Sequence, residues 1–197
     1  MNFEKHLNLE GLHAPFSPSQ PYWLRYDDEK ALEVYSNRKA AELGSRLHAW
    51  AKETIDLRIK QPRSKKTLYA YVNDAIGFQM DTEVVLFYSK RFFGTADSIS
   101  FRDGVLRIHD LKTGKTPAHM EQLLIYAALF CLEYKFDPSK IDIELRIYQN
   151  DEIFSVSILH EQEVHEEDQP TAETIKDIME QIIYLDTLLE RADREEV

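Results

Sequence analysis

The chain has 197 residues, of which 43% are hydrophobic and 30% are charged, and its formal net charge is −11 at pH 7. Its single cysteine, Cys131, excludes an internal disulfide and any four-cysteine zinc or iron–sulfur site within one chain. The apolar runs are too short to span a bilayer, and the first residues lack the pattern of a secretory signal. We therefore expect a single domain over residues 1–197, without a membrane partner, in the cytoplasm.

The acidic balance argues at first sight against a nucleic-acid partner, because neutralising phosphates requires lysine and arginine. The segment 58–66 qualifies this view, since it carries five basic residues and no acidic residue. A local basic patch on an acidic protein is compatible with contact to DNA. An ordinary solvated loop is the equal alternative for this segment.

The N-terminal half is expected to be mostly helical. Three closely spaced prolines predict an irregular arm over residues 1–25. Asp27 and Asp28 favour a helix start, and apolar residues at helical spacing continue to about Ile59. That length predicts a break near Ser36-Asn37. A second, shorter helix is expected over Thr67–Met80.

The second half alternates strands with helices, and Asp103-Gly104 and Asn150-Asp151 mark two hairpin turns. Because helices both precede and follow the strands, the pattern predicts an α/β fold with a central mixed sheet flanked by helices. The last helix is amphipathic and is expected to pack on the core. The expected strands are Thr82–Lys90, Gly94–Phe101, Val105–Lys112, Ile141–Gln149 and Ile153–Leu159, and the expected helices are Ala118–Phe136 and 172–193.

Two of these strands carry acidic residues whose positions predict a shared site. With the two-residue period of a strand, Asp110 and Lys112 continue the core-facing row of Leu106 and Ile108, whereas His109 points to the other face. In a regular hairpin, Asp97 and Asp110 converge near the strand ends. Gly94 and Gly114 allow close backbone approach there.

Two carboxylates brought together repel unless a cation lies between them, and Mg²⁺ prefers oxygen ligands. Lys112 beside them could hold an attacking water and stabilise charge on a phosphate. The combination of Asp97, Asp110 and Lys112 therefore favours phosphodiester hydrolysis. The alternative is a surface ion pair between Asp110 and Lys112 without any catalytic role.

The helix after these strands carries Gln122 and Tyr126, four residues apart and therefore on one face. Their neighbours on this helix are mostly apolar, so both polar side chains need partners. Nucleic-acid phosphate or a base could serve as that partner.

Four segments in order resemble the motifs of one enzyme family. Gly44–His48 is similar to motif I (Gly-x-x-x-His), Gly94–Asp97 to motif II, His109–Lys115 to motif III, and Gln122–Tyr126 to the Gln-x-x-x-Tyr motif of PD-(D/E)XK nucleases of the RecB-like and phage exonuclease group. The resemblance covers about residues 40–150 and implies a restriction-endonuclease-like core.

The resemblance also implies roles for single residues. It implies that Mg²⁺ or Mn²⁺ is bound by His48, Asp97, Asp110 and the backbone carbonyl of Leu111, and that Lys112 is the catalytic lysine. By the same resemblance, Gln122 and Tyr126 position the DNA and the metal shell. Taken by itself, His48 is more often a packed or exposed side chain than a ligand.

Other polar residues flank this stretch. Arg46, Thr113 and Lys115 are expected to touch phosphate, with solvated side chains as the equal alternative. Glu83, on the preceding strand, is a further candidate acid or a structural ion-pair partner.

These expectations describe a metal-dependent DNase, most simply an exonuclease that leaves 5′-phosphates and processes DNA ends in recombination. A chain of this size without a helicase segment resembles enzymes of phages or mobile elements, in a bacterial or infected host cell. A homo-oligomer or a recombination protein is a further expected partner. The alternative is a catalytically inactive nuclease-fold protein that binds DNA or serves assembly.

Overall fold

A computed structural model describes residues 4–9, 11, 13–114, 116–160 and 169–195. The chain divides into two compact units, Met1–Arg46 and Leu47–Val197. Helix α1 (Asp28–Asp56) contributes residues to both units. The expectation of one domain over the whole chain stays a prediction.

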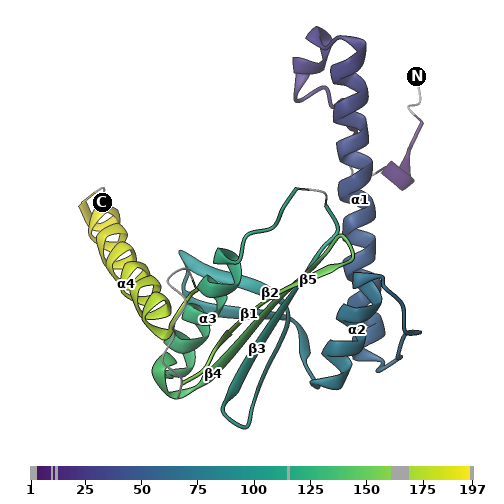
Figure 1. Ribbon diagram of the computed structural model, residues 1–197. Helices are drawn as coiled ribbons and strands as arrows, with labels where there is room; N and C mark the ends of the chain where they lie inside the picture. The colour runs from purple at the N-terminus through teal and green to yellow at the C-terminus, as the bar shows by residue number, and fades with distance from the viewer. Residues whose placement is uncertain (1–3, 10, 12, 115, 161–168, 196–197) are drawn as a thin grey trace. The chain divides into compact units, whose positions relative to one another are not determined.

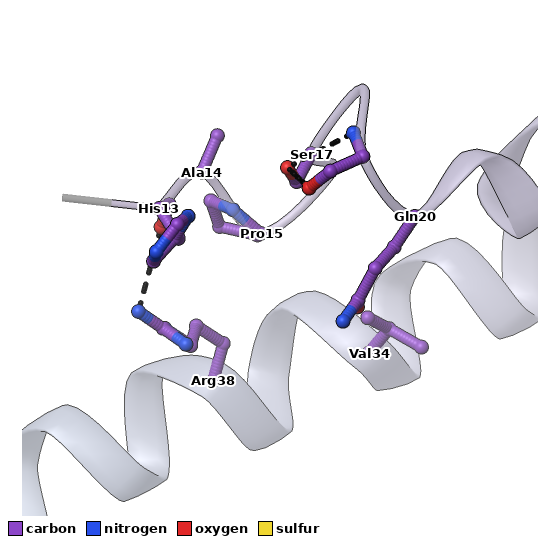
Figure 2. A pocket seen from close by; sticks show the side chains of 8 residues that line it. His13, Ala14, Pro15, Ser17, Gln20, Val34 and Arg38 are labelled. Atoms are coloured by element: carbon purple, nitrogen blue, oxygen red, sulfur yellow. Dashed lines mark hydrogen bonds between the residues drawn. The ribbon is translucent and has the colours of Figure 1, made fainter.

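The first unit contains the 3-10 helices η1 (Leu7–Leu9) and η2 (Pro21–Arg25) and the first part of α1. In Figure 2 the arm runs beside α1, and Arg38 Nη2 donates a hydrogen bond to the carbonyl of His13 (3.4 Å). The side chain of Asp27 caps α1 by accepting from Lys30 N (2.8 Å).

The expected break in α1 near Ser36-Asn37 is wrong, because the helix runs unbroken for 29 residues. No proline or glycine interrupts this part of the helix. The exposed ion pairs Lys30–Glu33 and Arg38–Glu42 lie on either side of the expected break, at spacings that favour a helix.

The second unit is built on a five-stranded mixed sheet, which confirms the predicted α/β class (Figure 1). The strand order is β1-β2-β3-β4-β5, and only β3 and β4 pair in parallel. The crossover between these two strands contains α3 (Glu121–Tyr134). The strands are β1 (Asp81–Ser89), β2 (Phe92–Arg102), β3 (Val105–Lys112), β4 (Asp142–Gln149) and β5 (Glu152–Ile158).

Both predicted hairpin turns are confirmed. Asp103-Gly104 joins β2 to β3, and Asn150-Asp151 joins β4 to β5. All four residues have positive φ, which is the conformation of a two-residue type I′ turn. The turns fix the strand register and thereby decide which side chains lie at the strand ends.

Helices cover both faces of the sheet. On one face, α3 and α4 (Ala172–Glu195) pack on β1–β5, with Ile175 and Ile182 of α4 buried in this core. On the other face, α2 (Thr67–Gly77) and the end of α1 enclose a smaller core around Leu111 and Tyr148. We call these the α3 face and the α2 face. Of the helices that the described ranges contain, none is long and apolar enough to cross a membrane.

Candidate functional site

The two acidic residues of the β2–β3 hairpin meet at one end of the sheet. The regular pairing of β2 with β3 ends at Ser98 and His109, and Asp97 lies one residue beyond it. The carboxylate Oδ2 of Asp97 accepts a hydrogen bond from the backbone N–H of Leu111 (2.9 Å). A side chain of β2 therefore continues the contact between the strands where the backbone ladder stops.

The side-chain alternation of β2 is interrupted at Asp97. Ala96 and Ile99 both belong to the α3-face core, although they are an odd number of positions, three, apart along the strand. Opposite Asp97, Glu83 adopts a positive φ of 53°, and the ladder between β1 and β2 omits this pair. A non-glycine residue rarely adopts this conformation, and such strain often accompanies functional sites.

His48 of α1 lies next to Asp97. Its Nδ1 is 3.5 Å from Asp97 Oδ2. A hydrogen bond to Asp97 raises the pKa of His48, and the negative charges of Asp97, Asp110 and Glu83 act in the same direction, while burial opposes them. The structure thus brings together His48, Asp97 and Asp110, and it adds Glu83, which the sequence left open.

A chain of polar contacts links Asp110 to α3. Lys112 Nζ lies 3.1 Å from Oδ1 and 3.0 Å from Oδ2 of Asp110, and it donates to Gln122 Oε1 at 2.9 Å. Gln122 Nε2 in turn donates to the hydroxyl of Tyr126 (3.2 Å). The predicted shared face of Gln122 and Tyr126 is therefore confirmed, and this face meets the lysine.

The ring of Tyr126 leaves no room for a side chain at position 94, so a glycine is required there. A Cβ atom at Gly94 would lie 2.7 Å from Cε1 of the Tyr126 ring, so any side chain there would displace the ring. The expectation of a similar close approach at Gly114 is wrong, since a Cβ there would meet nothing within 4 Å.

Asp110 is nearly inaccessible to water, and its charge is poorly compensated. Burial raises the pKa of Asp110, and the neighbouring charge of Asp97 raises it further, while Lys112 and His48 lower it. Its Oδ2 lies near Lys112 Nζ but has no partner in hydrogen-bond geometry among the described residues. A buried carboxylate in this condition favours an additional cation.

His109 lies on the α2 face, as the strand period predicted. Its ring packs edge-on against Phe78, and its Nδ1 lies 3.3 Å from the hydroxyl of Tyr148. Burial lowers the pKa of His109 to about 3, and the charges of Arg146 and Arg107 contribute. The ring is neutral at pH 7 and does not take part in the cluster around Asp110.

The remaining predicted residues are not brought into these contacts. Thr113 is exposed directly after β3, and Arg46 is exposed on α1 in the first unit. Lys115 lies outside the described residues. Their expected contacts with DNA stay predictions.

Gln149 holds the loop that follows Lys112, and sequence reasoning missed it. Its buried Nε2 donates to the carbonyls of Gly114 (2.8 Å) and Thr116 (2.7 Å), and its Oε1 accepts from Ala118 N (3.0 Å). Gln149 is the parallel neighbour of Lys112 at the same end of the sheet. The available signal was a polar residue at the end of the apolar row Ile143, Leu145 and Ile147 on one face of β4.

Replacing Gln149 with methionine, which keeps the volume but removes all three hydrogen bonds, is expected to lower the free energy of unfolding by about 2 kcal/mol. Urea denaturation measures this change. Faster hydrogen exchange at the Ala118 amide reports the release of the loop. The exposed Gln181→Met on α4 is the matched control. Equal stability and equal exchange in Gln149→Met would show that the loop does not depend on this side chain.

Comparisons of the chain with family models, with curated proteins and with solved structures find no match.

Proposed function

We propose that this chain is a metal-dependent deoxyribonuclease with a restriction-endonuclease-like core, and that it hydrolyses phosphodiester bonds at DNA ends. The observation that carries the proposal is the contact chain from Asp110 through Lys112 to Gln122 and Tyr126, with Asp97 and His48 at the same sheet end. A surface ion pair would not need a buried carboxylate, a neighbouring second acid and a helix that supplies two further polar groups. The sequence resemblance to RecB-like nucleases agrees with this arrangement.

The donor types at the site fit a hard divalent cation. The described residues contain no group of three or more His, Cys, Asp or Glu side chains placed to hold a metal ion. The two carboxylates, the imidazole of His48 and the backbone of Leu111 nevertheless supply oxygen and nitrogen donors of the kind that Mg²⁺ and Mn²⁺ accept. The Asp110 Oδ2 atom without a hydrogen-bond partner is the feature that such an ion would satisfy. A bound ion would supply a hydroxide at neutral pH and polarise a phosphoryl oxygen.

The chain's own residues have separate tasks in this proposal. Two partners on different elements, Asp110 and Gln122, orient the ammonium group of Lys112. From this position it holds a water molecule and stabilises the charge that develops on the phosphate. Tyr126 keeps the Gln122 amide in place through its hydroxyl group. His48 holds Asp97, whose other contact fixes the backbone of β3.

Phosphate contact outside the site is assigned to segment 58–66, which connects α1 to α2. All five of its basic residues are exposed. With a net charge of −11, the protein is expected to bind DNA with modest affinity and strong dependence on salt.

The test is an assay on end-labelled linear DNA and covalently closed circular DNA with Mg²⁺, Mn²⁺ or EDTA. We expect loss of the linear form in either metal, no loss in EDTA and an intact circle. Cleavage of both forms would assign an endonuclease instead. DNA binding without cleavage in either metal would overturn the enzymatic proposal and support the inactive binding protein.

A further inference from the structure

An exposed apolar surface lies on the neighbouring strands β1 and β2. The exposed fractions are 52% for Val85, 49% for Phe87 and 59% for Phe93. Phe87 on β1 is the direct partner of Phe93 on β2, and Val85 is the partner of Thr95. Partners in an antiparallel pair share a face, so the two rings project from the same side of the sheet. We call Val85, Phe87 and Phe93 the apolar platform.

The platform lies on the side of the sheet opposite α3. Leu86, between Val85 and Phe87, is buried in the α3-face core, so its neighbours along β1 point the other way. Neither Val85 nor Phe87 nor Phe93 belongs to the described core of either face. These side chains are therefore available to a flat ligand that approaches the open sheet surface.

The platform leads toward the part of the candidate site that Glu83 and Asp97 form. Along β1 the residue two positions before Val85 is Glu83, and along β2 the residue two positions after Thr95 is Asp97. At about 3.3 Å per residue, the four steps along β1 from Phe87 to Glu83 span roughly 13 Å. This length suits a few nucleotides of an extended strand whose next phosphate reaches Asp97.

The edge of β1 itself is closed to strand pairing. The backbone N–H of Phe87 donates to Glu133 Oε2 of α3 (2.8 Å), and a bulge lies between Phe87 and Ser89. A capped N–H and a bulge are features that protect an edge strand from pairing with another chain. The part of β1 that is accessible to a ligand is thus its face with the aromatic rings, and not its backbone edge.

We propose that the apolar platform stacks the unpaired bases of a DNA strand that leads into the site, so that the preferred substrate is single-stranded DNA or a frayed end. This inference rests on the proposed nuclease function. Exposed aromatic rings bind bases of any sequence because every base has a π-face. Lys90, exposed in the turn between β1 and β2, lies three residues from each ring along the chain and adds a positive charge to that turn.

The experiment compares Phe87→Ser/Phe93→Ser with a matched control, Phe154→Ser, which changes a phenylalanine that is 48% exposed on β5. Binding of a fluorescent single-stranded oligonucleotide in EDTA is expected to weaken about tenfold for each ring removed. It is expected to stay unchanged in the control. Cleavage of single-stranded DNA is expected to fall in parallel, whereas hydrolysis of bis(p-nitrophenyl) phosphate, which offers no base, is expected to persist.

The outcomes separate the two proposals. A parent protein that hydrolyses neither DNA nor the small diester contradicts the nuclease function. A parent that cleaves DNA, together with a double variant that binds and cleaves single strands equally well, contradicts the platform alone. A dimeric parent and a monomeric double variant would assign the surface to a second copy of the chain. Rescue of Phe93→Ser by Phe93→Trp, but not by Phe93→Leu, supports stacking over general apolar contact.

Discussion

Replacing Lys112 with methionine is expected to reduce DNA cleavage by about a hundredfold to a thousandfold while the fold survives. The methionine keeps the apolar stem but removes the ammonium group that contacts both Asp110 and Gln122. Without that charge, the attacking water and the transition-state phosphate lose their positively charged partner. Single-turnover cleavage of end-labelled DNA in Mg²⁺ measures the loss, and circular dichroism reports the fold.

The matched control for this substitution is Lys140→Met, which removes an exposed ammonium group near the other end of the crossover from β3 to β4. It changes the net charge by the same amount, so it separates the local role of Lys112 from general attraction of DNA. If Lys112→Met cleaves DNA as fast as Lys140→Met, Lys112 is not catalytic and the nuclease proposal loses its central residue.

Asp110→Asn is expected to abolish cleavage and at the same time to stabilise the protein by about 1 kcal/mol at pH 7. Burial and the charge of Asp97 raise the pKa of Asp110 in the folded state. A raised carboxyl pKa means that the charged form costs stability above the folded-state pKa, and that this cost disappears as the pH falls through that pKa. Asparagine keeps the shape and removes the charge.

Thermal or urea unfolding at several pH values measures this effect. The advantage of Asp110→Asn over the parent is expected to be largest at neutral pH and to shrink in acid. Asp103→Asn, in the exposed turn of the same hairpin, is the control and is expected to leave stability unchanged. A less stable Asp110→Asn protein would mean that the ion pair with Lys112 dominates, which is the alternative without a catalytic role.

The strand period was sufficient to separate Asp110 and Lys112 from His109, because side-chain direction in a regular strand depends only on local geometry. The same rule predicts that Asp97 shares a face with Ile99 and Phe101, and this prediction is wrong because Ala96, next to Asp97, lies on that face. There the alternation is interrupted opposite the left-handed Glu83, a conformation that a non-glycine residue rarely adopts and that the strand pattern does not predict. The two-residue period predicts side-chain direction only where the strand is regular.

The features that the sequence did not predict depend mainly on contacts between residues far apart in the chain. Gln149 binds loop carbonyls that precede it by more than thirty residues, and no local pattern links the two segments. His48 was expected near the acids only through the resemblance, since nothing in its own helix distinguishes it. The expected break in α1 was based on typical helix length, which the actual helix exceeds.

The parallel pairing of β3 with β4 also determines when, during folding, the residues of the candidate site come together. Parallel strands need a crossover, and here α3 must dock before Gln149 can reach the loop after Lys112. Such non-local pairing forms late and slowly. During synthesis, the ribosome must therefore release the chain well past Gln149 before the lysine, the glutamine and the two acids can be assembled. Under the proposed nuclease function, a partly folded chain would therefore not yet cut DNA.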